Sequence, residues 1–219
     1  MVSTSRKIII ADDHPLFRSA LCQAIKQGLG DVTLLECDSI NKLEALLSTH
    51  QDIDLVLLDL HMPGANGFSG LVLVRREHPE IPVVIVSASE EQQNIRRAID
   101  YGASGFIPKS ADLPTISKAV ESILQGNIWL PEKASDSPVS HEEKDFAERI
   151  KTLTPQQFRV FMMLTKGLLN KQIASEVDVS EATVRTHMTA IFRKLGVRNR
   201  TQAVLAANYL TIDSPKIVQ

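Results

Sequence analysis

Cysteine and long apolar runs are scarce in this chain of 219 residues. Its two cysteines, Cys22 and Cys37, do not have CxxC spacing, which argues against a zinc site and against a disulfide framework. No segment approaches the ~20 consecutive apolar residues of a membrane-spanning helix. A short apolar run near the start is interrupted by Asp12 before it is long enough for the core of a signal peptide. We therefore expect a cytoplasmic protein with no membrane partner.

A large net charge is also absent, since the formal net charge is −2, but the charge is unevenly distributed along the chain. Residues 1–130 carry 11 Lys and Arg against 16 Asp and Glu, a net charge of −5. Residues 151–219 carry 10 against 4, a net charge of +6. A basic part joined to an acidic part indicates that the basic part, residues 151–219, binds nucleic acid.

The acidic part alternates between short apolar runs and helical patterns. The apolar runs, rich in Ile, Leu and Val, lie at 8–11, 33–37, 55–59, 83–87 and 105–109, and the helical patterns at about 15–28, 39–50, 67–78, 90–102 and 112–126. Strands that are apolar at consecutive positions fit a sheet covered on both faces. The alternation predicts an α/β domain over residues 1–130, with a five-stranded, doubly wound parallel sheet.

Residues 131–150 have two prolines and alternating charges, with few residues to bury, and we expect a polar linker there, in which Phe146 and Ile150 are candidates to dock on the second domain. From Thr154 the pattern is helical, with Pro155 at the first helical position and Gln157 completing a capping box. Further helices are expected at 170–177, 181–195 and about 200–210. Two helices joined by a tight turn, in a basic segment, predict a small all-α helix-turn-helix domain over residues 151–219.

Polar side chains occur where four of the predicted strands end. They are Asp12, Asp13, Asp59, Ser87 and Lys109. Ligands of open α/β sheets bind at the carboxyl ends of the strands, so these groups are expected to converge. Two carboxylates ~4 Å apart repel by ~4 kcal/mol at an effective dielectric near 20, which calls for a cation. Oxygen ligands favour Mg²⁺, and a carboxylate can itself accept a phosphoryl group.

The same segments resemble a known family. IIIADDHPLFR, LVLLDLHMPGANG, VVIVSAS and GASGFIPKS resemble the receiver domain of two-component response regulators (flavodoxin-like) over residues 6–129. LTPQQFRV, GLLNKQIASEVDVSEATVRTHMTAIFRKLGV and RNRTQAV resemble the LuxR-type DNA-binding domain over about 151–210. This pairing is similar to that of response regulators of the NarL/FixJ subfamily.

The resemblance implies a role for each polar residue of the first domain. Asp59 is the expected phosphoacceptor, and a sensor histidine kinase is expected to supply the phosphoryl group. Mg²⁺ is expected to be held by Asp12, Asp13, Asp59 and the backbone carbonyl of His61. The residues expected to respond to the phosphoryl group are Ser87, Phe106 and Lys109, with Phe106 repacking inward.

In a helix-turn-helix, the second helix enters the major groove. We expect Thr183, Arg185, Thr186 and Thr189 to face the bases, and Arg185 can make a bidentate contact with guanine. His187 is placed near the groove rim. The candidates for contact with the DNA backbone are Asn170, Lys171, Arg193, Lys194, Arg198 and Arg200, although each basic side chain could equally be a solvated surface residue.

These observations predict a phosphorylation-controlled, DNA-binding transcriptional regulator that forms a homodimer when active. It is not expected to be an enzyme beyond catalysing its own phosphorylation and dephosphorylation. An alternative is a DNA-binding regulator whose receiver is a phosphorylation-independent dimerisation module. A phosphatase acting on small substrates is a weaker hypothesis, because it leaves the basic domain unexplained.

Overall fold

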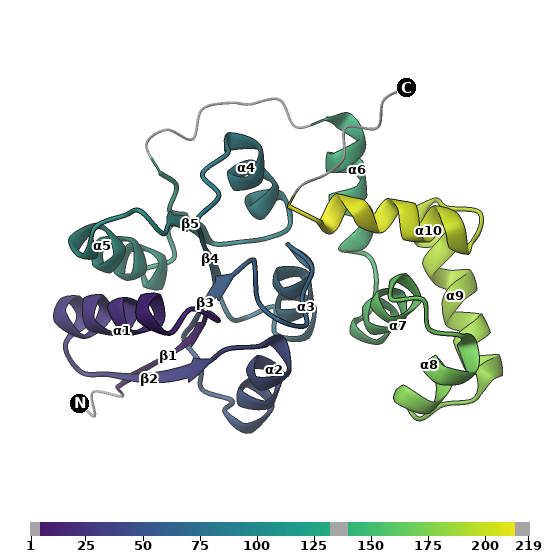
Figure 1. The fold of residues 1–219 in the computed structure, drawn as a ribbon, viewed down its shortest axis with the longest axis horizontal. Coiled ribbons are helices and arrows are strands. Elements are labelled where there is room, and N and C mark those ends of the chain that lie inside the picture. Colours follow the sequence, from purple (N-terminus) through teal and green to yellow (C-terminus); the bar gives the residue numbers. More distant parts are fainter. Residues whose placement is uncertain (1–4, 132–139, 213–219) are drawn as a thin grey trace. The chain divides into compact units, whose positions relative to one another are not determined.

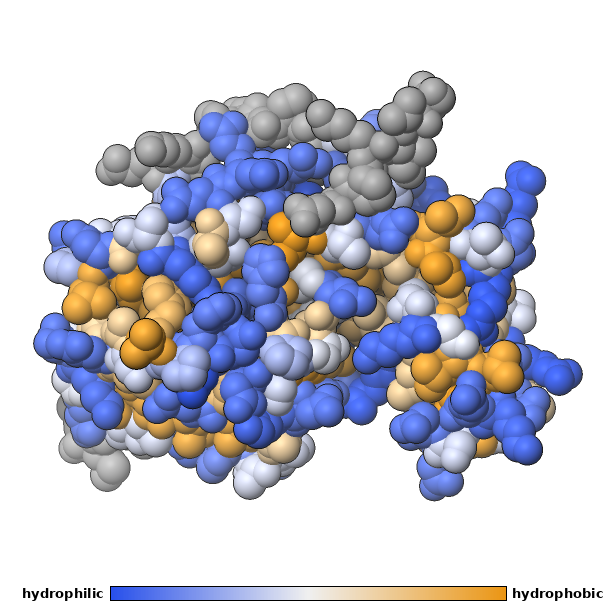
Figure 2. All heavy atoms as spheres, in the orientation of Figure 1, coloured by the Kyte–Doolittle hydropathy of each residue, from blue (hydrophilic) through white to orange (hydrophobic). Residues whose placement is uncertain are grey.

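The computed structural model describes residues 5–131 and 140–212. The chain divides into two units, one up to Val139 and one from Ser140, and each is described by itself. Within the described residues, none of the helices has the length and apolar character needed to cross a membrane. The charged and polar residues gather on the surface drawn in Figure 2, with apolar residues scattered between them.

The first unit is built around a five-stranded parallel sheet with strand order β2-β1-β3-β4-β5. The strands are β1 (Arg6–Ala11), β2 (Val32–Cys37), β3 (Leu55–Asp59), β4 (Val83–Ser87) and β5 (Gly105–Pro108). The helices that alternate with them are α1 (Pro15–Leu29), α2 (Ile40–Thr49), α3 (Ser69–Glu77), α4 (Gln92–Asp100) and α5 (Leu113–Leu124). The α/β fold with a doubly wound parallel sheet is therefore confirmed.

Both faces of this sheet are covered by helices. Figure 1 shows α1 and α5 on one face and α2 and α3 on the other. Ile8, Leu57 and Val86, each on a different strand, pack with Ile25 of α1 and Val120 of α5 in one buried cluster. All five residues of β3 and of β4 are buried, which explains why these strands are apolar at consecutive positions.

The chain after α5 returns to the sheet and pairs with the edge strand β5. Gly105 and Trp129 form a parallel β-bridge; the N–H of Phe106 donates to the carbonyl of Trp129 (2.9 Å) and the N–H of Trp129 to that of Ser104 (3.2 Å). We call residues 128–131 the strap. A Cβ on Gly105 would lie 3.0 Å from the Trp129 carbonyl oxygen, so glycine is what permits this close approach.

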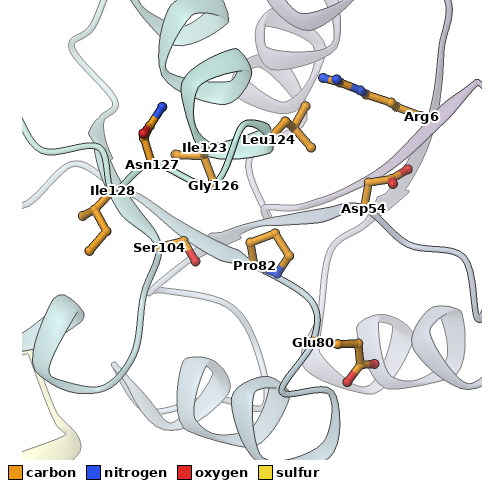
Figure 3. Close-up of a pocket in the computed structure, with 10 residues that line it drawn as sticks. All are labelled: Arg6, Asp54, Glu80, Pro82, Ser104, Ile123, Leu124, Gly126, Asn127 and Ile128. Atoms are coloured by element: carbon orange, nitrogen blue, oxygen red, sulfur yellow. The ribbon is translucent and has the colours of Figure 1, made fainter.

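A surface pocket lies where the strands of the sheet begin, at the end away from the carboxyl ends of the strands (Figure 3). Its charged side chains, Arg6, Asp54 and Glu80, lie apart and do not converge on one point. Asp54 Oδ2 already accepts the backbone N–H of Lys7 at 2.7 Å. The end of the sheet where the strands begin therefore does not assemble a polar site of the kind predicted at their carboxyl ends.

The second unit is entirely helical in its described residues. Its elements are α6 (His141–Ile150), α7 (Pro155–Thr165), α8 (Asn170–Glu176), α9 (Glu181–Leu195), α10 (Arg200–Ala206) and the 3₁₀ turn η1 (Ala207–Leu210). Thr154 and Gln157 form the predicted capping box of α7, and Ser180 caps α9 by accepting the N–H of Thr183. Val184, Met188, Ile191 and Leu195 of α9 are buried, as their spacing predicted.

Helix α6 corrects the expectation of a polar linker over residues 131–150. Residues 132–139 lie outside the described residues, but residues 141–150 form a helix that opens with a capping box between Ser140 and Glu143. The ring of Phe146 stacks with that of Tyr209 (5.3 Å between centroids), and Arg149 donates to the carbonyl of Leu195 (3.1 Å). This helix therefore packs into the second unit.

Candidate functional site

The acidic residues meet where the strand order reverses. Asp12 and Asp13 follow β1, and Asp59 ends β3, the neighbouring strand, whose Leu58 is in register with Ala11. In the sheet, β2 lies on one side of β1 and β3 lies on the other, so the order of the strands reverses between β1 and β3. Open α/β sheets bind ligands at this place. The sequence prediction that these carboxylates converge is therefore correct in geometry.

The carboxylates of this group are close together and mostly buried. Asp12 and Asp59 are 1% and 2% exposed. One ligand atom from each of Asp12, Asp13, His14 and Asp59 lies within 4.8 Å of the others. The N–H of His14 donates to Asp12 Oδ1 (2.7 Å), which fixes the first carboxylate at the end of its strand.

Lys109, which follows β5, brings the one ammonium group that contacts these carboxylates in the described part of the chain. Its Nζ lies 2.7 Å from Asp12 Oδ2 and 2.8 Å from Asp59 Oδ2. Burial alone would lower the pKa of Lys109, but its contacts with the two carboxylates outweigh burial and raise the pKa. The side chain is thus held as a cation between two buried anions.

The residues of this group fit a divalent cation. Three carboxylates and one ammonium leave two negative charges uncompensated. Asp12 Oδ2 and Asp13 Oδ1 are both buried, and each contacts one nitrogen at 2.7 Å: the Lys109 ammonium for Asp12 and Nδ1 of His14 for Asp13. Hard carboxylate oxygens with unsatisfied charge are the donor set that Mg²⁺ takes.

Ser87 and Phe106 lie on strands next to this group. Ser87 ends β4, is fully buried, and its Oγ accepts the N–H of Ser89 (3.1 Å). The N–H of Lys109 donates to the Ser87 carbonyl (2.8 Å), which ties the ends of β4 and β5 together. Phe106 is already fully buried in this structure. The expected inward repacking of Phe106 therefore does not start from an outward ring here.

His61 approaches Asp59 from the loop after β3. Its N–H donates to Asp59 Oδ1 (3.3 Å), and its side chain is 54% exposed, with Nδ1 3.9 Å from the same oxygen. Sequence analysis placed His61 near the site through its backbone and missed His14, whose imidazole is part of the acidic cluster. The signal was the position of His14 directly after the paired aspartates.

In the second unit, the residues of α9 that were predicted to face DNA bases lie at the surface. Thr183, Arg185, Thr186 and Thr189 are exposed, and His187 is partly buried. The hydroxyls of Thr186 and Thr189 donate to carbonyls one turn earlier in the helix (both 3.1 Å). In the helix before the turn, Asn170 is half-buried and Lys171 is exposed; Arg193 and Arg198 are exposed as well.

Two of the basic residues predicted to contact DNA make hydrogen bonds inside the second unit. Lys194 Nζ donates to the carbonyl of Thr152 (2.7 Å) and to Gln157 Oε1 (2.8 Å). Arg200 donates to the carbonyls of Leu164 and Leu168 at the end of α7 (3.0 and 2.7 Å). Lys194 of α9 thus holds the start of α7, and Arg200 of α10 holds the chain at its end.

Comparisons with known proteins agree with this arrangement. Residues 8–121 match the family described as response regulator receiver domain, and residues 151–207 match the luxR family of bacterial regulatory proteins. The chain is 45% identical over 208 residues to a glycerol metabolism activator of Pseudomonas putida, covering 92% of this chain and 94% of that protein. It is 32% identical over 209 residues to the nitrate/nitrite response regulator protein NarP of Escherichia coli K12, covering 93% and 94%.

Solved structures show the same fold. RcsB from Salmonella enterica serovar Typhimurium, solved bound to a promoter in the presence of the phosphomimetic BeF₃⁻, is 22% identical with a TM-score of 0.57, covering 95% of this chain and 100% of that one. A LuxR family DNA-binding response regulator from Silicibacter pomeroyi is 33% identical with a TM-score of 0.52, covering 58% of this chain and 98% of that one.

A receiver unit with a carboxylate cluster, joined to a helix-turn-helix unit, defines a class of signalling proteins that act on DNA. This chain belongs to the response regulators of the NarL/FixJ type, which combine a receiver domain with a LuxR-type DNA-binding domain. It is thus a DNA-binding transcriptional regulator controlled by phosphorylation, and not an enzyme acting on an external substrate.

Proposed function

We propose that this regulator accepts a phosphoryl group on Asp59 from a sensor histidine kinase, with Mg²⁺, in the cytoplasm. The observation that carries the proposal is the Lys109 ammonium, which lies between the buried carboxylates of Asp12 and Asp59 at the reversal of strand order. The ammonium and the carboxylates lie in contact with one another, which is the preorganised arrangement that transfer of a charged group requires.

Mg²⁺ would be held by the carboxylates of Asp12, Asp13 and Asp59 and the carbonyl of His61, and would offset the charge that develops on the transferring phosphoryl oxygens. Asp59 acts as the nucleophile. The phosphorus–nitrogen bond of the kinase's phosphohistidine breaks as the bond from an Asp59 oxygen to phosphorus forms. The receiver catalyses this transfer, and later hydrolysis, on itself alone.

The response to phosphorylation passes through Lys109 and Ser87. A phosphoryl group adds ≈ −1.5 to −2 charges and three acceptor oxygens. The Lys109 ammonium then pairs with a phosphoryl oxygen, and the Ser87 hydroxyl turns from Ser89 to donate to another. Because the N–H of Lys109 is bonded to the Ser87 carbonyl, both groups move together with the ends of β4 and β5.

The output is a change in dimerisation and DNA binding by the second unit. Helix α9 would read bases through its exposed face, with Arg185 as the side chain able to contact guanine in bidentate fashion. The residues proposed to contact DNA are Thr183, Arg185, Thr186, Thr189, His187, Asn170, Lys171, Arg193 and Arg198. A homodimer would read two half-sites about one helical turn apart.

The acceptor assignment is tested with acetyl phosphate as a phosphodonor. Asp59→Asn removes the nucleophile, so labelling of the intact chain in the presence of Mg²⁺ should disappear. Asp52→Asn is the matched control, because Asp52 pairs with Lys7 on the surface, away from the cluster, and its loss should leave labelling intact. Undiminished labelling of Asp59→Asn would show that another residue accepts the phosphoryl group.

The proposed DNA contacts are tested by comparing two exposed basic residues. Arg185→Ala should relax sequence preference, whereas Lys171→Ala should weaken binding to all sequences about equally and reduce the salt dependence. Selection of bound DNA from a random pool, at two salt concentrations, measures both effects. The reverse outcome would mean that α9 enters the groove in a different register.

The alternative is a DNA-binding regulator whose receiver works independently of phosphorylation. If the receiver acts only as a dimerisation module, DNA affinity will be the same with and without acetyl phosphate and Mg²⁺. A change in affinity that Asp59→Asn abolishes would exclude this alternative.

A further inference from the structure

His14 contributes an imidazole to the acidic cluster that the proposed phosphotransfer does not use. Its Nδ1 lies 2.7 Å from Asp13 Oδ1, 3.4 Å from Asp12 Oδ1 and 3.8 Å from Asp59 Oδ2. The side chain is 64% exposed, so it reaches the cluster from the solvent side. No other imidazole in the described part of the chain contacts all three carboxylates.

The contact between His14 and Asp13 is direct. Asp13 Oδ1 is buried, and His14 Nδ1 lies 2.7 Å from it. A carboxylate oxygen and an imidazole nitrogen are both metal donor atoms, so this pair lies side by side where one ion can take both.

The four ligand atoms have a separation that one ion can bridge. They lie within 4.8 Å of one another. Ligands on opposite sides of an ion are about 4.0–4.6 Å apart when each bond is ~2.0–2.3 Å. The backbone of His14 is fixed by its N–H bond to Asp12 Oδ1 and by Pro15, the first residue of α1, so the ring is held beside the carboxylates.

The type of donor atom determines which ions benefit. Carboxylate oxygens suit Mg²⁺, whereas an imidazole nitrogen suits first-row transition ions, whose affinities for nitrogen ligands exceed those of Mg²⁺. We propose that His14 is an additional metal ligand of the receiver, and that it makes this site bind divalent transition-metal ions more tightly than Mg²⁺. The inference rests on the proposed metal site of Asp12, Asp13 and Asp59.

The consequence is a receiver whose metal occupancy depends on the transition ions around it. Mg²⁺ would be held by the carboxylates and the His61 carbonyl without the His14 ring, whereas Co²⁺ or Mn²⁺ would also take the imidazole nitrogen of His14. His14 is then a residue that determines metal specificity.

The test is a calorimetric titration of the intact chain with Co²⁺ and, separately, with Mg²⁺. His14→Gln removes the imidazole from an exposed position and should weaken Co²⁺ binding about tenfold or more, while Mg²⁺ affinity changes less than about twofold. His50→Gln is the matched control, because His50 lies at the end of α2 and outside the cluster, and it should leave both affinities unchanged.

A second measurement identifies the nitrogen directly. Pulsed electron paramagnetic resonance of the Mn²⁺-loaded chain should show modulation from an imidazole nitrogen, which His14→Gln removes. If His61→Gln removes that signal and His14→Gln does not, the nitrogen donor is His61 and the inference is wrong. Co²⁺ binding that is equal in wild type and His14→Gln would also overturn it.

The outcomes also separate this inference from the proposed function. If Mg²⁺ does not bind and Asp12→Asn has no effect on any ion, the proposed metal site itself fails. If Mg²⁺ binds and Asp12→Asn abolishes it, the site holds, and only the His14 variant decides the inference. Co²⁺ binding that survives Asp12→Asn would place that ion elsewhere and refute the role of His14.

Discussion

Replacement of Lys109 by methionine should make the receiver strongly dependent on Mg²⁺ for its stability. The ammonium is the cation that contacts the buried carboxylates of Asp12 and Asp59. Methionine keeps much of the volume and removes the charge. Two carboxylates ~4 Å apart repel by ~4 kcal/mol at an effective dielectric near 20. Loss of one partner of a buried ion pair costs ~3–5 kcal/mol. We therefore expect the free energy of unfolding to fall by about 3–5 kcal/mol in EDTA.

The assay is urea unfolding followed by the fluorescence of Trp129, the one tryptophan of the chain. Trp129 belongs to the strap, so its emission reports the receiver and not the second unit. The midpoint of Lys109→Met should fall by roughly 2 M in EDTA, and millimolar Mg²⁺ should restore more of this loss in the variant than it adds to wild type. Lys42→Met, which breaks an exposed pair with Asp38, should change the midpoint little.

The same pair of proteins gives a pH prediction. The pKa of Lys109 is raised above its ordinary value of 10.5 in the folded chain, so its stabilisation is fully present below that pH and is lost as pH rises through the folded pKa. The stability difference between wild type and Lys109→Met should be constant from roughly pH 7 to 9 and shrink at higher pH. A variant as stable as wild type in EDTA, or a difference independent of alkaline pH, would refute the account of Lys109.

Three further predictions concern other parts of the chain. Gly105→Ala adds a Cβ 3.0 Å from the Trp129 carbonyl oxygen and should cost about 1–3 kcal/mol, with a red shift of tryptophan emission as the strap loosens; an unchanged spectrum would contradict the close approach. Lys194→Met should lower the melting temperature of the second unit, measured by calorimetry, because it removes hydrogen bonds to the α7 cap, whereas Lys171→Met should leave it unchanged; equal shifts would contradict the internal role of Lys194. Burial, and then the neighbouring carboxylate Asp38, raise the pKa of Cys37 to about 12, so alkylation by iodoacetamide at neutral pH should be far slower than that of a free thiol; rapid alkylation of the native chain would contradict this burial.

The receiver could be predicted closely from the sequence because its strands carry a strong signal. The runs of β3 and β4 are buried on both faces, so consecutive Ile, Leu and Val are required there, and the polar residues at the ends of four of the five runs mark where those strands leave the core. Parallel strands then bring Asp12, Asp59 and Lys109 to one edge whatever their separation in the chain. Helix α9 was equally clear, since Ser180 and Gly196 bound a regular apolar stripe.

The parts that sequence analysis missed depend on contacts between segments. Helix α6 looked like a linker because proline and charge dominate residues 131–150, yet Ser140 and Glu143 have capping-box spacing and Phe146 and Ile150 lie four residues apart. The composition concealed a local signal that was present. Lys194 is different, because its contact with the carbonyl of Thr152, in the turn before α7, depends on packing that no local pattern encodes.

The strap limits edge-to-edge strand pairing between copies of this receiver. β5 is the last strand of the sheet, and its outer backbone groups would be open to pairing with another chain. Trp129 covers them through its own backbone, and Pro131 follows within two residues as a poor partner for further strand addition. A fragment of the chain that ends before Trp129 would leave this edge bare and be prone to self-association, whereas one that extends to residue 131 keeps it covered.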